Sequence, residues 1–486
     1  MNFRVLFSFA RIKRKVNFRN VAYILILFLA ILLGMLFGEV NNAGGAFGSP
    51  FNTTSTVLFY LGILLTYAIA FYIAIRNKIL RINNKFFIFL IFGIVILLYM
   101  SLVSLCTKFN NFPSGLNITP LDRAKSIMDV SLSLLMAFSF FFLLPAFKEK
   151  DLAIKIFAIL FIGFTIVMII YSLSTEIDKY IEFINHPSFF TKYEQGVAQN
   201  WCYSFFTYGN VYGHVLFLCC LVVTLLSVVY KRRFIFLFNF ILAVFILFSG
   251  SRTALLGFTV LCIVYGIYFL LHLYKRNKIY FLILGMVFLF TLLLLIFEIF
   301  LFKTIKIHED VLVGENEYQT VTYTLEVLLY KFFYYVEKRL DLYEMCIAYY
   351  NTTDYIFGIG YNLNDLVCRI TSEAFNFHNG YVEVFSAGGI LLSLVYLFLI
   401  GYMVYKAIKI HKYFPKFTMF FFVSLLSYLV YQLGEAFIPL FNVFGGGIMG
   451  YYLFGVILSK ERETNESIDI KSLFYNKKAK EVVKNG

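Results

Sequence analysis

Residues 231–278 read KRRFIFLFNFILAVFILFSGSRTALLGFTVLCIVYGIYFLLHLYKRNK. Two apolar runs, 234–249 and 254–274, lie between basic clusters and are joined by the short link 249–253. A membrane-spanning helix needs about 20 mostly apolar residues. Basic clusters collect at the cytoplasmic ends of such helices. This stretch therefore predicts two spanning helices whose free ends face the cytoplasm and whose link lies on the outer side.

The same pattern extends over most of the chain. Of its 486 residues, 60% are hydrophobic and 14% are charged. Soluble globular chains are about 45–50% apolar and about 25% charged. We predict an all-α polytopic membrane protein with about twelve spanning helices. The predicted spans are 21–38, 55–75, 86–105, 127–147, 152–173, 210–230, 234–249, 254–274, 279–302, 381–405, 417–434 and 445–459.

Basic residues predict the orientation. The net charge is +14, and its sources stand in short runs between apolar stretches. Runs of this kind mark cytoplasmic loops, so they explain the charge without a nucleic-acid partner. With an even number of spans, both termini face the cytoplasm. We expect a multi-pass protein of a bacterial inner or plasma membrane. The seven Cys show no metal-ligand spacing and no disulfide framework.

This orientation divides the chain into five segments. They are a basic cytoplasmic N-terminus (1–20), spans one to nine (21–302), a large extracytoplasmic loop (303–377), spans ten to twelve (378–459) and a basic cytoplasmic tail (460–486). A loop of that length is unusual inside a compact domain and is often functional. Its apolar stretches 323–336 and 340–350 predict helices. We therefore expect an active site that faces outward.

Arg252, in the outer link Ser249-Gly250-Ser251-Arg252-Thr253, is the first candidate site residue. Ionisable residues at membrane depth are costly and tend to mark sites or pathways. A guanidinium group also binds phosphate through two parallel hydrogen bonds. The alternative is an Arg at a helix end whose side chain reaches the lipid headgroups. The local sequence leaves both interpretations open.

The stretch His378-Asn379-Gly380-Tyr381 opens the tenth span directly after the long loop. A His at a helix start can act as a general base because its pKa lies near neutrality. The alternative is a His whose hydrogen bonds are satisfied at the membrane interface. Glu383 follows closely, and its ordinary role is that of a carboxylate at a helix start.

Three further cations are candidates. Arg339 precedes Phe357-Gly358-Ile359-Gly360, whose glycines predict a tight turn after a helix; alone, it could be a solvated charge. Arg123 and Lys125, on the outer side before span four, could contact a phosphate, although a helix-end role is favoured for both. The chain has no phosphate-binding loop, no His-Glu-x-x-His helix and no outer Asp-x-Asp pair. A reaction without metal or cofactor on a lipid-linked substrate fits what remains.

Together these stretches resemble the O-antigen ligase and polysaccharide polymerase superfamily. The resemblance rests on Ser-Gly-Ser-Arg-Thr-Ala-Leu-Leu at 249–256, Arg339 ahead of Phe-Gly-Ile-Gly at 357–360, His-Asn-Gly-Tyr at 378–381, Ala-Gly-Gly-Ile at 387–390 and, less tightly, Tyr-Gly-Asn-Val-Tyr-Gly at 208–213. It implies a helical membrane glycosyltransferase fold of the class C type, acting on a glycan carried by undecaprenyl diphosphate.

The resemblance also implies roles for residues. Arg252 and Arg339 would hold the donor diphosphate and stabilise charge on the leaving group. His378 would deprotonate or orient the acceptor hydroxyl. The residues expected to bind substrate are Asn210, Asn379, Tyr381, Arg123 and Lys125. Expected partners are the lipid-linked donor, the glycan acceptor and membrane lipids, with a flippase and a chain-length regulator beside them.

Three functions stay open. The first is polymerisation of capsular, exopolysaccharide or O-antigen repeat units. It is favoured over the second, ligation of a glycan to lipid or protein, because abundant Lys, Asn, Ile, Phe and Tyr suggest an AT-rich bacterium that lacks lipid A. The third is a flippase for lipid-linked oligosaccharide. A flippase needs charges along a central cavity, but Asp129, Lys155 and Glu298 all lie near span ends.

Overall fold

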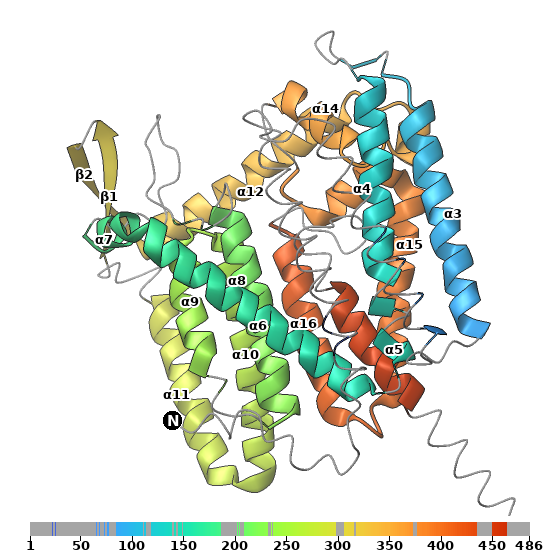
Figure 1. The fold of residues 1–486 in the computed structure, drawn as a ribbon. Coiled ribbons are helices and arrows are strands. Elements are labelled where there is room, and N and C mark those ends of the chain that lie inside the picture. Colours follow the sequence, from blue (N-terminus) through green and yellow to red (C-terminus); the bar gives the residue numbers. More distant parts are fainter. Residues whose placement is uncertain are drawn as a thin grey trace, which may run out of the picture.

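The computed structural model shows a mostly helical protein (Figure 1). It describes residues 84–109, 111–112, 118–138, 140–141, 144–147, 149–185, 202, 204, 209–231, 235, 237–297, 306–314, 317–372, 377–434 and 450–463, with a few isolated positions before residue 84. Apart from those isolated positions, the predicted spans at 21–38 and 55–75 lie outside the described residues, as do the predicted basic N-terminus and the tail after residue 463.

Apolar helices occupy most of the remaining predicted spans. Up to the long loop they are α3 (Asn84–Cys106), α4 (Pro120–Phe138), α5 (Leu144–Ala146), α6 (Lys150–Thr175), α7 (Ile177–Asn185), α8 (Gly209–Thr224), the π-helical segment η3 (Leu225–Val229), α9 (Phe238–Phe248), α10 (Arg252–Arg276) and α11 (Lys278–Phe297). After the loop they are α15 (Gly380–Ile410), α16 (Pro415–Gln432) and a helix at 450–463.

Three helices of the described part are long and apolar enough to cross a membrane: Lys150–Thr175, Gly209–Val229 and Gly380–Ile410. Shorter apolar helices lie at Ile91–Cys106, Phe238–Phe248 and Arg252–Tyr268. These helices support a membrane protein. The number of about twelve spans and the class C fold stay predictions.

The long loop departs from the all-α prediction at its start. Strands β1 (Lys306–Gly314) and β2 (Glu317–Thr324) form an antiparallel hairpin in which Lys306 pairs with Thr324. The hairpin is rich in Val and Thr, which favour strands because their branched side chains pack well on a pleated surface. The predicted helices then appear as α12 (Leu325–Ile347), followed by α13 (Thr352–Phe357) and α14 (Leu363–Ser372).

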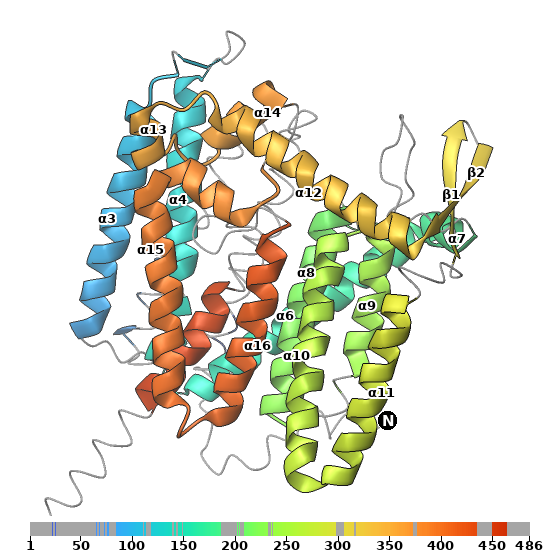
Figure 2. The ribbon, with the colours of Figure 1, turned by 180° about the vertical axis from the view of Figure 1, so that it is seen from behind.

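Helix α12 joins the two sides of the molecule at one end of the bundle. In both views it runs from the hairpin, over the ends of α8 and α9, toward α13 and α14 beside α3 and α4 (Figure 2). Thr324 begins the helix as its N-cap, and its side chain accepts a hydrogen bond from the Val327 N–H (3.4 Å). The chain of the loop therefore lies across the helix ends that carry the predicted site.

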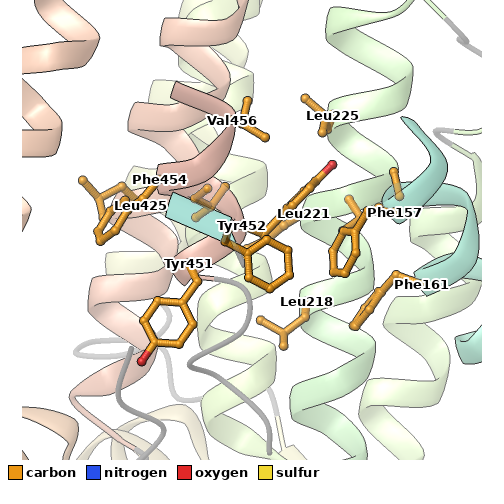
Figure 3. Packing of buried hydrophobic residues seen from close by; sticks show 14 of the residues in the cluster. Phe157, Phe161, Leu218, Leu221, Leu225, Leu425, Tyr451, Tyr452, Phe454 and Val456 are labelled. Carbon is orange, nitrogen blue, oxygen red and sulfur yellow. The ribbon is translucent and has the colours of Figure 1, made fainter. Parts of the chain in front are cut away.

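The core gathers around α8. In the continuous helix Gly209–Val229, which α8 and η3 form together, 89% of the most apolar stretch is buried inside the protein. Tyr452, from the helix at 450–463, packs its ring 4.5 Å from that of Phe157 and donates a hydrogen bond to the Ile154 carbonyl (2.9 Å) (Figure 3). Lipid tails are as apolar as these side chains, so close packing stabilises such a core more than removal from water does.

Candidate functional site

Arg252 is the first residue of α10, and a capped turn holds it there. Gly250 adopts a left-handed φ of 65°, which only Gly adopts without strain. The Ser249 hydroxyl donates to the Ile246 carbonyl (2.7 Å), and the Ser251 oxygen accepts from the Ala254 N–H (3.4 Å). Arg252 thus adds its charge to the positive N-terminal end of a helix, a favourable place for an anion.

The start of α8 packs against this turn. A Cβ on Gly209 would collide with the Ser249 carbonyl oxygen, and one on Gly213 would collide with the side chain of Ser251. Both positions therefore require Gly. Asn210, predicted to bind substrate, follows Gly209 directly and so lies beside the turn that carries Arg252.

Asn379 connects α15 to the end of α16. Its side-chain oxygen accepts hydrogen bonds from the Tyr381 and Val382 N–H groups (2.9 and 3.2 Å), so it is the N-cap of α15. Its amide group donates to the Leu433 carbonyl (3.4 Å). Gly434, which follows Leu433, lies close to Thr253. A Cβ added at Gly434 would lie 2.6 Å from the methyl group of Thr253. The starts of α10 and α15 therefore meet at the end of α16.

Arg339 and His378 lie together. The Arg339 guanidinium donates to the His378 carbonyl oxygen at 3.5 Å, and His378 adopts a left-handed φ of 48°. Such a backbone conformation is uncommon outside Gly and persists where surrounding contacts hold it. Tyr343, one turn along α12 from Arg339, lies near them. Burial raises the pKa of the Tyr343 hydroxyl. Its hydrogen bond to Asn379 and the positive charge of Arg339 partly offset this rise in pKa.

Residues 237–397 match the family model described as O-antigen ligase. The predicted resemblance to the O-antigen ligase and polysaccharide polymerase superfamily is confirmed. The match covers about a third of the chain and contains Arg252, Arg339 and His378. No match was found among curated proteins or solved structures.

Two glycine motifs of the O-antigen ligase segment dock onto each other. Helix α15 breaks at Gly389, where φ is 64° and ψ is −164°. The broken turn leaves carbonyls for the loop after α13, so the Ile359 N–H bonds to Ser386 and the Gly360 N–H to Ala387, both at 3.0 Å. A Cβ on Gly358 would collide with the Ala387 carbonyl.

The Tyr99 hydroxyl of α3 reinforces this contact. It lies 2.9 Å from the Phe357 carbonyl and 2.7 Å from the Gly388 carbonyl. The glycine-containing stretches 357–360 and 387–390 thus form one contact between the outer loop and α15. This contact places α14 next to α15.

Tyr381 has a different surrounding from the one expected of a substrate ligand. Its hydroxyl donates to the Leu429 carbonyl at 2.9 Å and so fastens α15 to α16. Its backbone N–H completes the Asn379 cap. Both contacts hold the start of α15 against the end of α16, next to the candidate site.

Arg123 closes the end of α3. Its guanidinium donates to the carbonyls of Ser104 (2.5 Å), Leu105 (3.1 Å) and Thr107 (3.0 Å). These are carbonyls that a helix leaves without internal partners at its C-terminal end. Its contacts thus match the helix-end role that was weighed against phosphate binding. Lys125, two residues further along α4, is partly buried.

Sequence reasoning missed a buried polar cluster next to His378. Glu383, read as an ordinary carboxylate at a helix start, is 3% exposed and interacts with Asp365 and Asn364 of α14. Glu383 stands inside an otherwise apolar stretch of the sequence. That position was the signal from which its burial could have been predicted. No group of three His, Cys, Asp or Glu suited to a metal ion occurs in the part of the chain that the structure describes.

Proposed function

We propose that this chain is a glycosyltransferase that polymerises undecaprenyl-diphosphate-linked oligosaccharide repeat units on the outer face of the membrane. Its product would be a capsular, exopolysaccharide or O-antigen polymer. The observation that carries the proposal is the contact between the Arg339 guanidinium and the His378 carbonyl, at the place where α10 and α15 begin. The contact holds a guanidinium group and the residue proposed as the base at one end of the bundle.

The donor diphosphate would bind between Arg252 and Arg339. Negative charge builds on the diphosphate as its bond to the sugar breaks. Guanidinium groups and a helix N-terminus that are already in place stabilise that charge without reorganising. Each Arg would bind two oxygens at once, which a Lys cannot do in the same geometry.

His378 would act on the acceptor. As the acceptor hydroxyl oxygen bonds to the anomeric carbon of the donor sugar, the ring nitrogen of His378 takes the hydroxyl proton. The bond between that carbon and the diphosphate oxygen breaks, and undecaprenyl diphosphate leaves with the electron pair. Such a base contributes about 10²–10⁴-fold to a rate. The left-handed backbone of His378 and its contact with Arg339 support a fixed position for the ring.

A ligase is the second candidate, because the matching family model is described as O-antigen ligase. The chemistry at the donor would be the same. Only the acceptor would differ: a lipid or protein in a ligase, and a growing or single repeat unit in a polymerase. The product therefore separates the two functions, whereas the residues that bind diphosphate do not.

The test is complementation of a deletion strain with Arg252→Ala, Arg339→Ala and His378→Ala. Each variant should abolish long-chain polysaccharide while the protein remains at its normal level. Lys412→Ala, in the exposed turn between α15 and α16, is the matched control and should restore full chain length. Single repeat units on the lipid carrier would mark a polymerase, and full-length lipid-linked polymer a ligase. Long chains in all three variants would contradict the site.

A further inference from the structure

A cavity lies between the parts of α8, α9, α10 and α16 that are remote from Arg252. Its volume is about 580 Å³, within the range of about 300–1,000 Å³ that is typical of ligand pockets. Apolar side chains form most of its wall, including Phe258, Leu261 and Met419. A wall of this kind suits a hydrocarbon chain.

The cavity belongs to the cytoplasmic half of the protein in the predicted orientation. Its lining comes from the end of α8 and η3, the first turn of α9, the middle of α10 and the first two turns of α16. Along α10, a rise of about 1.5 Å per residue separates Tyr265 from Arg252 by roughly 20 Å. The cavity is therefore distinct from the outer site, and its occupant does not depend on the proposed function.

Two side chains that line this cavity, Asn239 and Tyr265, each have one buried polar atom without a hydrogen-bond partner among the described residues. Asn239 is 3% exposed, and its amide group donates to the Thr224 hydroxyl (3.1 Å). The Thr224 hydroxyl in turn donates to the Cys220 carbonyl (2.7 Å). The Asn239 side-chain oxygen and the Tyr265 hydroxyl, however, have no partner among the described residues. Buried groups of this kind are rare and call for a ligand or a water molecule.

The helix that forms one wall is irregular at this point. Residues Leu225–Val229 form the π-helical segment η3, which ends with the Tyr230 N–H bonded to the Leu225 carbonyl at 3.4 Å. Segments of π-helix are rare and occur frequently at functional sites. Here the segment follows Thr224 directly and contributes Val228 to the lining. The irregularity thus coincides with the polar end of the cavity.

A cation stands at the same end. Lys416 is exposed, lines the cavity and lies in the first turn of α16. Basic pockets between helices on the cytoplasmic side of a membrane bind anionic headgroups. A ligand with a phosphate, a neighbouring hydroxyl donor and an apolar tail would therefore match Lys416, the Asn239 oxygen and the apolar wall in turn.

We infer that this cavity binds one anionic glycerophospholipid of the inner leaflet whose headgroup carries hydroxyl groups, as phosphatidylglycerol does. Its phosphate pairs with Lys416, a headgroup hydroxyl donates to the Asn239 side-chain oxygen, and one acyl chain lies along Phe258, Leu261 and Met419. Phosphatidylcholine lacks both the net charge and the hydroxyl donor. Phosphatidylethanolamine has donors but no net charge.

The test uses the purified full chain in lipid nanodiscs that contain phosphatidylglycerol, phosphatidylethanolamine or phosphatidylcholine. Native mass spectrometry counts the lipids that remain bound, and thermal unfolding reports their effect. One phosphatidylglycerol should be retained preferentially and should raise the melting temperature, because a ligand that binds only the folded state stabilises it.

Variants locate the binding site. Lys416→Gln should weaken phosphatidylglycerol retention about fivefold, the loss expected for one Lys at an anionic lipid headgroup. Tyr265→Phe tests the cavity wall with little change of shape, and Asn239→Leu removes the acceptor oxygen. Lys412→Gln, in the turn before α16 and outside the lining, is the matched control and should retain the lipid.

Three results with the lipids and with Lys416→Gln would overturn the inference. They are equal retention of phosphatidylcholine and phosphatidylglycerol, preferential retention of phosphatidylethanolamine, and unchanged retention in Lys416→Gln. An equal loss in Lys412→Gln and Lys416→Gln would also overturn it, because it would indicate general attraction to the cytoplasmic surface. Asn239→Leu could fail to fold, so the conclusion rests on Lys416→Gln.

Discussion

Arg252, Arg339 and Arg123 share a side chain but differ in what surrounds it. Arg123 donates to three carbonyls at the end of α3. Arg339 donates to the carbonyl of His378, and Arg252 lies in the first turn of α10. A guanidinium whose donors are engaged by the backbone stabilises a helix end. Arg252, at the N-terminus of α10, and Arg339, whose guanidinium contacts the residue that carries the candidate base, are the two that we propose for an anionic substrate.

Arg252→Lys separates charge from geometry. We expect it to lower polymer formation roughly tenfold or more, because a Lys cannot make two parallel hydrogen bonds to one phosphate. The amount of folded protein should not change. Polysaccharide chain length and total polymer are measured against protein level in complemented cells. Full polymer in Arg252→Lys would show that charge alone suffices.

Arg123→Ala should act on stability instead. Removing the guanidinium leaves the carbonyls at the end of α3 without their partners, at a cost of about 1–3 kcal/mol. The melting temperature of the purified variant should fall, and polymer per folded molecule should stay constant. A stable Arg123→Ala protein with no polymer would instead assign Arg123 to substrate binding.

Asn379 tests the N-cap of α15. Asn379→Ala should lower the free energy of unfolding by about 0.5–2 kcal/mol, because the Tyr381 and Val382 N–H groups lose their acceptor. Asn379→Asp keeps that acceptor and should retain most of the stability. Thermal unfolding of both variants is compared. Equal melting temperatures for wild type and Asn379→Ala would contradict the capping role.

At the scale of elements, the contact between the loop after α13 and the break in α15 supports the helix that begins at the candidate site. Two backbone hydrogen bonds and the Tyr99 hydroxyl hold it. Positive φ values at Gly358 and Gly389 make both positions intolerant of a side chain. The sequence predicted a tight turn at 357–360 and gave 387–390 as part of the family resemblance. It could not show that the two stretches pack on each other, because they meet only in the folded chain.

Gly389→Ala tests this contact. A Cβ at Gly389 would collide with the Ile356 carbonyl. We expect little folded protein from this variant. Gly401→Ala, on the same helix, is the matched control, because a Cβ there meets no atom within 4 Å. It should fold as well as wild type, since Ala favours a helix over Gly by about 1 kcal/mol. Size-exclusion chromatography of both proteins gives the comparison.

The β-hairpin and the Glu383 cluster show where prediction from sequence ends. Apolar runs of about 20 residues are visible without neighbours, so α6, α8 and α15 could be predicted. The strands at 306–324 are short and contain many polar residues. The sequence pattern of so short a segment does not distinguish a strand from a helix. The burial of Glu383 depends on Asn364 and Asp365, which lie on another helix.

For the molecule as a whole, orientation is the property on which the outward-facing site depends. A membrane-impermeant maleimide tests it in intact cells. Cys106 is exposed at the end of α3, which the predicted orientation places outside. It should be labelled, and Cys106→Ser should lose the label. Cys202 should react slowly, because burial, with the charge of Glu176, raises the pKa of its thiol to about 12. Labelling of Cys106 only after permeabilisation would reverse the orientation.

The candidate catalytic residues could be proposed from sequence because each stands beside an apolar run, and the predicted orientation places all three on one side of the membrane. Arg339 and His378 indeed lie within hydrogen-bonding distance through the His378 carbonyl. The structure adds what pattern cannot give: Tyr381 is fastened to Leu429, and Arg123 closes α3.

The central claim is that this chain joins lipid-linked repeat units, and reconstitution tests it most directly. The purified protein is placed in liposomes with one undecaprenyl-diphosphate-linked repeat unit as the only substrate. We predict a ladder of lipid-linked oligomers, with one undecaprenyl diphosphate released for each glycosidic bond, and no ladder from His378→Ala. A preparation of wild-type protein that leaves the repeat units unjoined, but transfers them to an added lipid or protein acceptor, would contradict the claim.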